Sequence, residues 1–171
     1  MPTLSDPFFQ KSVILLCDYT RDTAFGMVIN RPSTIRMGDI ILDQNTKLDH
    51  LNCPILVGGP VQPEFFWAIH SSDFADVSTT KVDLTISMSS VQEVLAGVSR
   101  GDGPETFHLG FGYAGWGPGQ LDREIREGAW WVAPLNTDLV LKMPYNQRWE
   151  AVLQSIGIDP CTTSFFTTGE A

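Results

Sequence analysis

The chain has 171 residues, of which 43% are hydrophobic and 18% charged, and it carries a formal net charge of −9. This length predicts one domain covering residues 1–171, and the composition is typical of globular rather than disordered proteins. The acidic excess disfavours nucleic acids and anionic membranes as partners, because like charges repel. The 11 basic residues are scattered along the sequence, so no basic cluster offsets this repulsion.

The cysteines and the N-terminal residues favour a cytoplasmic protein. Cys17, Cys53 and Cys161 form no Cys-x-x-Cys pair, so we predict neither a disulfide framework nor a metal site. The first residues show no secretory signal pattern, and no apolar run approaches the roughly 20 residues of a membrane span. We therefore expect no metal and no membrane partner.

Strand patterns dominate the first half of the chain. The apolar runs 13–18 and 24–30 are predicted to pair as a hairpin across a short polar linker. Arg31-Pro32 is expected to end that pairing, because proline has no N–H to donate. A short helix is expected over residues 37–42. Further strands are predicted at residues 55–57, which lead into a Gly58-Gly59-Pro60 turn, and at 65–70 and 84–88.

Two helices are clearly marked in the second half. Ser90 and Glu93 have the spacing of a capping box, apolar residues follow at helical spacing, and Gly101 is placed to end the helix. The same apolar spacing begins at Trp149 and stops at Gly157. Strands are predicted at residues 106–111, 130–133 and 138–141. Because the strands come in pairs rather than alternating strictly with helices, the pattern favours an α+β fold.

The residues GFGYAG at 110–115 match the Gly-x-Gly-x-x-Gly pattern of dinucleotide sites, but their context does not fit. The helix should begin inside the pattern, whereas here Trp116-Gly117-Pro118-Gly119 follows and the nearest helical pattern spans residues 118–127. We therefore predict no nucleotide cofactor. We expect a surface loop at residues 110–119, which either packs Tyr113 and Trp116 over the core or presents them to a ligand.

Catalytic signatures are absent from the sequence. There is no Gly-x-Ser-x-Gly or His-Glu-x-x-His motif, and His50, His70 and His108 are far apart, so structural roles are favoured for all three. Arg31 has two interpretations. It could bind an anionic ligand group with both arms of its guanidinium, or it could bond a carboxylate or main-chain carbonyls at the end of a strand.

Several long motifs together resemble the YqgE/AlgH family. They run in order over almost the whole chain: MPTLSDPFF, FGMVINRP, VGGPV, LGFGYAGWGPGQLDREI, the later Trp-Trp and Pro134, RWE and IGIDP. The resemblance implies an α+β fold with a mixed or antiparallel sheet bent into a pseudo-barrel and flanked by helices. It implies no agreed biochemical activity, although some members are labelled transcriptional regulators of alginate synthesis. The hallmark positions would be Asp6, Pro7, Phe9, Asn30, Arg31, Pro32, Gly58, Gly59, Pro60, Gly112, Tyr113, Gly115, Trp116, Gly117, Gly119 and Gln120.

The sequence departs from the family pattern at both ends. Members usually carry a strand-like segment before the Met-Pro that stands here at Met1-Pro2. They often close with Ala-Gly-His-Ala, where this chain has Thr168-Gly169-Glu170-Ala171. A role that rests on that histidine is therefore in doubt here.

The leading hypothesis is a non-enzymatic binding or regulatory module without a cofactor. It would recognise an unidentified protein or small molecule through the glycine–aromatic segment 110–120 and its neighbours, with these candidate binding residues: Asn30, Arg31, Gly58, Gly59, Gly112, Tyr113, Trp116, Gly117 and Gln120. The alternative is an enzyme acting on a small polar or phosphorylated metabolite, with Arg31 as the anion clamp. Direct control through DNA is disfavoured by the −9 charge and the lack of a basic helix.

Overall fold

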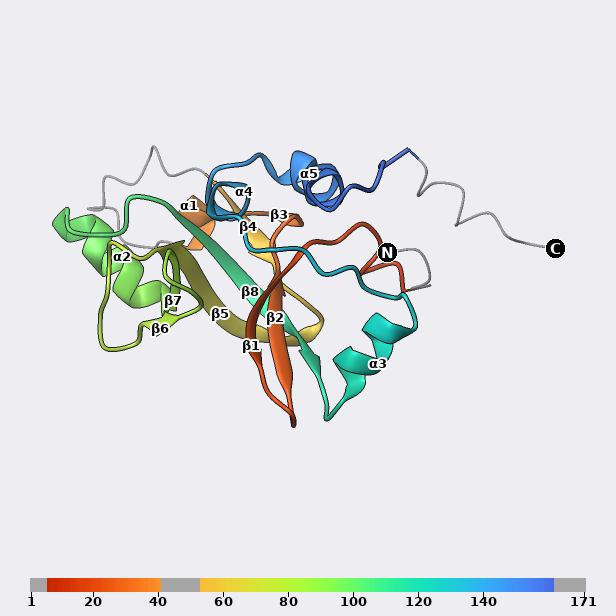
Figure 1. The fold of residues 1–171 in the computed structure, drawn as a ribbon. Coiled ribbons are helices and arrows are strands. Elements are labelled where there is room, and N and C mark those ends of the chain that lie inside the picture. The colour runs from red at the N-terminus through yellow and green to blue at the C-terminus, as the bar shows by residue number, and fades with distance from the viewer. Residues whose placement is uncertain (1–5, 41–52, 162–171) are drawn as a thin grey trace.

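A curled mixed sheet forms the centre of the protein, and helices lie around it (Figure 1). This computed structural model describes residues 6–40 and 53–161. It confirms the expected α+β class and the bent sheet. The last two residues of the helix predicted at 37–42 lie outside the described residues, and so does His50.

The central strand of the sheet is β8 (Phe107–Trp116). One edge of β8 pairs antiparallel with β5 (Val61–Ser71), which then pairs with β7 (Ile86–Ser89) and, beyond it, β6 (Thr80–Lys81). The other edge changes partner along its length. It pairs in parallel with β4 (Pro54–Val57) at Gly110 and Phe111, and antiparallel with β2 (Ala24–Val28) from Ala114 to Trp116. This change of partner accompanies the curl of the sheet seen in Figure 1.

The predicted hairpin is confirmed, and its pairing ends at Val28, before Arg31-Pro32. β1 (Ile14–Tyr19) pairs antiparallel with β2, and no other strand of residues 6–40 and 53–161 pairs with it. Pro32 nevertheless belongs to the sheet, because it is the first residue of β3 (Pro32–Arg36), which pairs with β4. Proline is tolerated at the first position of a strand, where a missing donor costs little.

The surface loop predicted at residues 110–119 is wrong for its first seven residues, which belong to β8. The glycines serve close packing. A Cβ on Gly110 would lie 2.1 Å from the Trp67 ring, and one on Gly59 would lie 2.0 Å from the main chain of Tyr113. Gly112 has φ +67°, which favours glycine, and its carbonyl accepts a 2.8 Å hydrogen bond from Trp67 Nε1. The pattern therefore lets two chain segments and one indole pack in van der Waals contact.

The helices at residues 90–101 and 118–127 form largely as predicted. In α2 (Val91–Arg100), Ser90 Oγ accepts from Glu93 N–H and Gly101 ends the helix with φ +85°. The helix α3 (Gln120–Arg126) starts two residues later than predicted. The short helix α1 (Met37–Ile40) also forms, and α5 (Arg148–Ser155) follows a 3₁₀ turn, Tyr145–Gln147. No helix in the described residues is long and apolar enough to cross a membrane.

Two predicted strands near the C-terminus do not form. Residues 138–141 belong instead to α4 (Thr137–Leu141), because Asn136 Oδ1 caps the helix by accepting from Leu139 N–H at 3.0 Å. Residues 130–133 adopt no strand pairing. Their β-branched and aromatic composition predicted a strand, but no described strand pairs with them.

We predict that Gly59→Ala lowers the free energy of unfolding by about 3 kcal/mol, because the new methyl group overlaps main-chain atoms that have no free rotamer. Gly38→Ala in α1 is the matched control. A Cβ there meets nothing within 4 Å, so the change should stay within about 1 kcal/mol. Urea unfolding followed by tryptophan fluorescence measures both, and equal effects would contradict the packing role of Gly59.

Candidate functional site

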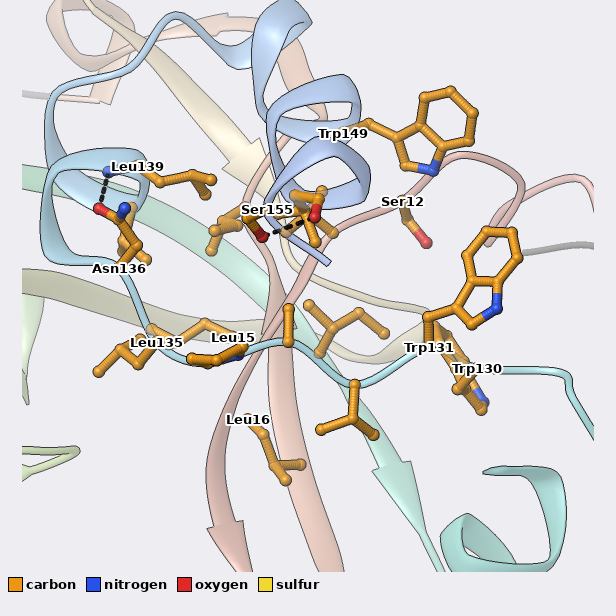
Figure 2. A pocket seen from close by; sticks show the side chains of 18 of the residues that line it. Ser12, Leu15, Leu16, Trp130, Trp131, Leu135, Asn136, Leu139, Trp149 and Ser155 are labelled. Carbon is orange, nitrogen blue, oxygen red and sulfur yellow. Dashed lines mark hydrogen bonds between the residues drawn. The ribbon is translucent and has the colours of Figure 1, made fainter. Parts of the chain in front are cut away.

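A pocket of about 460 Å³ lies beside β1, with α3, α5 and residues 130–136 around it (Figure 2). Its lining includes four of the chain's five tryptophans, and we call it the tryptophan pocket: Trp116, Trp130, Trp131 and Trp149. Buried core residues such as Leu15, Ile29 and Leu153 also line it. The pocket is thus an opening into the apolar core, of a size typical for small-molecule or side-chain binding.

A single carboxylate fixes two of the indoles. Glu124 Oε2 accepts hydrogen bonds from Trp116 Nε1 at 2.9 Å and Trp130 Nε1 at 2.7 Å, and its Oε1 accepts from Gln120 Nε2 at 2.8 Å. Although burial raises the pKa of Glu124, the bonds from Gln120, Trp130 and Trp116 and the charge of Arg123 outweigh it and lower the pKa below its usual value. The carboxylate is therefore ionised at neutral pH, and it holds the two rings edge to face with centroids 5.6 Å apart.

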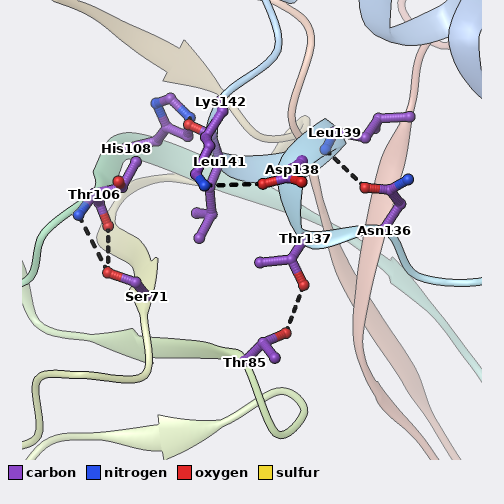
Figure 3. A network of polar contacts seen from close by, with 10 residues as sticks. All are labelled: Ser71, Thr85, Thr106, His108, Asn136, Thr137, Asp138, Leu139, Leu141 and Lys142. Atoms are coloured by element: carbon purple, nitrogen blue, oxygen red, sulfur yellow. Dashed lines mark hydrogen bonds and ion pairs between the residues drawn. The ribbon is translucent and has the colours of Figure 1, made fainter.

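The chain that follows Trp130 is held at its two ends only. We call residues 131–135 the bridging segment. Before it, Trp130 bonds to Glu124; after it, Asn136 caps α4, and Thr137 Oγ1 hydrogen-bonds Thr85 Oγ1 at 2.6 Å (Figure 3). Between these anchors, no main-chain group of the bridging segment is hydrogen-bonded to another described residue. This wall of the pocket is consequently tied at both ends and unpaired in the middle.

The polar side chains that line the pocket already have partners within the fold. Ser12 Oγ donates to Phe9 O at 2.6 Å, and Ser155 Oγ donates to Val152 O at 2.7 Å. Asn136 caps α4, and Asp83 Oδ1 accepts from the loop that follows it. These contacts leave a lining that is chiefly aromatic and aliphatic.

Three large apolar side chains lie exposed at the pocket. Val132 is 69% exposed, and Leu16 and Leu135 are each 42% exposed. Clusters of exposed apolar groups beside a cavity are a mark of binding surfaces, because water solvates them poorly.

Asn30 and Arg31, both predicted to bind a ligand, hold the chain that leads into β1. Asn30 Oδ1 accepts from Val13 N–H, and its Nδ2 donates to Lys11 O, each at 2.8 Å. Arg31 Nη2 donates to Gln10 O at 2.7 Å, and the guanidinium lies 5.4 Å from the centre of the Phe8 ring. Of the two interpretations of Arg31, the bond to main-chain carbonyls is the one observed.

The remaining candidate binding residues fall into two separate groups. Gly58, Gly59 and Gly112 are buried where the chain segments cross, so their part is in packing. Tyr113 follows them and packs against Phe25, with ring centroids 4.9 Å apart.

Trp116, Gly117 and Gln120 form the second group. Gln120 Oε1 accepts from Gly117 N–H at 3.1 Å, and the amide of the same side chain donates to Glu124. Trp116 is the one candidate binding residue that lines the tryptophan pocket. The structure therefore places the candidates in different parts of the sheet and around one wall of the pocket, rather than on one common surface.

The two described histidines have structural partners. His70 Nδ1 is 2.8 Å from Ser71 O, and its Nε2 is 2.9 Å from Ser89 Oγ. A Ser–His contact of this kind could activate a hydroxyl nucleophile. However, His70 is 0% and Ser89 4% exposed, so no substrate reaches the hydroxyl without opening the sheet.

His108 lies in a buried network with an arginine. Arg148 is fully buried, and it donates to Ile29 O at 2.6 Å and lies 3.0 Å from His108 Nε2. His108 Nε2 is also 3.0 Å from Leu141 O, and its Nδ1 is 3.2 Å from Tyr145 Oη. Because arginine can only donate and a carbonyl can only accept, Nε2 pairs with one or the other according to the tautomer. Burial, followed by the charge of Arg148, lowers the pKa of His108 to about 4. The imidazole is thus neutral at physiological pH, so it adds no second positive charge beside the buried Arg148.

Sequence reasoning missed most of the pocket. The signal that was available is compositional, because four of the five tryptophans fall between residues 116 and 149. The structure also contains no group of three or more His, Cys, Asp or Glu placed to hold a metal within residues 6–40 and 53–161.

Glu124→Gln should lower the free energy of unfolding by about 1.5 kcal/mol, because an amide offers one acceptor oxygen and no charge to two indole donors. The folded-state pKa of Glu124 is lowered, so its contribution is present above the ordinary carboxyl pKa and is lost as the pH falls through the lowered value. The difference between variant and parent should therefore shrink below about pH 4. Urea unfolding at several pH values measures it. Exposed Glu127→Gln is the control, and a loss of equal size there would argue against the role of Glu124.

Comparison with known proteins gives a consistent result. A family profile described as AlgH-like matches residues 1–161. A UPF0301 protein of Methylococcus capsulatus is 38% identical over 162 residues, covering 93% of this chain and 86% of the relative. A UPF0301 protein of Paracoccus denitrificans is 36% identical over 170 residues, covering 96% of this chain and 90% of the relative.

Solved structures agree with these matches. The solution structure of the AlgH protein from Pseudomonas aeruginosa has a TM-score of 0.76 and 31% identity, covering 100% of this chain and 90% of that one. The crystal structure of a Corynebacterium diphtheriae protein has a TM-score of 0.75 at 21% identity, covering 98% and 87%, which shows a shared fold. The chain therefore belongs to the AlgH-like family.

Proposed function

We propose that this protein is a non-enzymatic binding module, and that the tryptophan pocket holds the apolar part of its ligand or partner. The observation that carries the proposal is the pocket itself, with about 460 Å³ lined by four tryptophans and flanked by exposed Leu16, Val132 and Leu135. Aromatic side chains provide large contact areas with few rotatable bonds, so they bind apolar groups at a low entropic cost.

The chemistry around the pocket supports binding over catalysis. A reaction requires a nucleophile, acid or base that reaches the substrate, whereas the hydroxyls of Ser12 and Ser155 each donate to a main-chain carbonyl. The buried His70–Ser89 pair does not line the pocket.

The enzyme alternative rested on Arg31 as an anion clamp. The Nη2 of Arg31 already binds the carbonyl of Gln10 at 2.7 Å, so a phosphate or carboxylate that used this nitrogen would compete with that carbonyl. This competition weakens the alternative. A regulatory role in the cytoplasm would then act through a bound partner rather than through DNA, since the net charge of −9 opposes a phosphate backbone.

The test uses the fluorescent probe anilinonaphthalene sulfonate, which brightens in apolar sites. Val132→Lys places a charged side chain at the pocket and should weaken probe binding about tenfold, which corresponds to about 1.4 kcal/mol. The probe is an anion, so added lysine would attract it and a loss of affinity cannot come from repulsion. Titration of the probe into each variant gives the dissociation constants.

Val77→Lys is the matched control, because Val77 is 99% exposed and does not line the pocket. It should bind the probe as the parent does. If Val132→Lys also binds the probe unchanged, the tryptophan pocket is not the apolar binding site and the proposal fails.

A further inference from the structure

One side of the tryptophan pocket is the free edge of a sheet. Within the part of the chain that the structure describes, β1 pairs with β2 only, and the residues Ile14 to Leu16 that line the pocket belong to this strand. Val28 donates its N–H to Gly58 O, away from β1, so the opposed residues Ile14 and Val28 form a non-hydrogen-bonded pair. By the alternation of an antiparallel ladder, Ile14 and Leu16 direct their N–H and C=O groups outwards, and Leu15 directs its groups to Met27.

The bridging segment presents a second row of unpaired main-chain groups at the same pocket. No main-chain group of residues 131–135 is bonded to another described residue, and proline at 134 removes only one of the five N–H donors. Main-chain groups that carry no protein partner must be hydrated or be paired by something added. An added strand would pair them and cover the apolar side chains at once.

On these grounds we propose that the occupant of the tryptophan pocket is an extended apolar peptide of a partner protein, which adds as a strand to the edge of β1. The inference rests on the proposed binding function and names its ligand class. Main-chain hydrogen bonds to Ile14 and Leu16 fix the peptide, and every second side chain enters the space lined by the tryptophans.

The chemistry of the peptide follows from its surroundings. Side chains that enter the pocket are apolar, because the lining is chiefly aromatic and aliphatic. The peptide residues on either side of this apolar stretch are basic, because the protein carries a net charge of −9 and attracts cations. An isolated segment fits better than the edge of another sheet, because the bridging segment also lines the pocket beside β1.

The experiment uses the probe peptide acetyl-Lys-Leu-Val-Leu-Val-Leu-Lys-amide, alone and N-methylated at every second residue in each of the two possible frames. N-methylation removes the donors of one strand edge and keeps every side chain. Isothermal titration should show a dissociation constant at least tenfold larger for at least one of the two methylated peptides than for the parent peptide. If both methylated peptides bind as well as the parent peptide, the pocket recognises apolar groups without strand pairing and the inference is overturned.

Hydrogen exchange by NMR locates the pairing on the protein. The amides of Ile14 and Leu16 should exchange at least tenfold more slowly with peptide bound, and the amide of Leu15, already paired with Met27, should not change. Amides of Ile14 and Leu16 that are protected before peptide is added would mean that a segment of the same chain outside the described residues, or a second copy, already holds this edge. That result would overturn the assignment to a partner.

A pair of variants separates the main chain from the side chain. Leu16→Pro removes an outward N–H that makes no bond to β2, and Leu16→Ala keeps the N–H and shortens the side chain. Peptide binding should be lost in the first and weakened less in the second, and equal losses would count against strand addition. If the fluorescent probe binds the parent protein and the peptide does not, only the strand inference fails; if neither binds, the proposed function fails with it.

Discussion

The fold depends on the close approach of two main-chain segments, 58–59 and 112–113. No side chain larger than hydrogen fits at Gly59, where a Cβ would lie 2.0 Å from the main chain of Tyr113. At the same place Trp67 lies against Gly110 and donates its indole N–H to Gly112 O. This contact lets β8 pair with β4 in one part of its edge and with β2 in the next. β2, and β1 beside it, thereby lie where their core-facing residues pack against α5.

The sequence predicted the elements whose causes are local. The hairpin at residues 13–30 follows from two apolar runs and a polar linker, and α2 follows from the Ser90 cap and the Gly101 stop. Residues 110–116 were misread as a loop because their cause lies far away in the chain. Glycines in a strand are explained only by Trp67, which is more than 40 residues earlier. Residues 138–141 were misread because the cap at Asn136 outweighs the strand propensity of a short apolar run.

The candidate site was predictable only in part. Trp116 and Gln120 were identified from the glycine–aromatic segment, and both belong to the wall held by Glu124. Leu16, Val132 and Leu135 could not be identified, because a pocket built from β1, α3, α4, α5 and the bridging segment has no signature in any one stretch of sequence. Arg148 shows the same limit. Its burial without a carboxylate within 4 Å among the described residues depends on carbonyls from Ile29 and Met143 and on neutral His108.

The carboxylate that binds Trp116 and Trp130 fixes one side of the cavity, whereas the main chain of the other side makes no hydrogen bond within the described residues. The two indoles are fixed in orientation, whereas the chain just beyond them is fastened only where it begins and ends. In the proposed binding role, ligands of different thickness would be accommodated by displacement of the side without main-chain bonds, while the two fixed indoles would impose one shape on whatever touches them. Selectivity would reside in the half of the guest that faces Trp116 and Trp130, and tolerance in the other half.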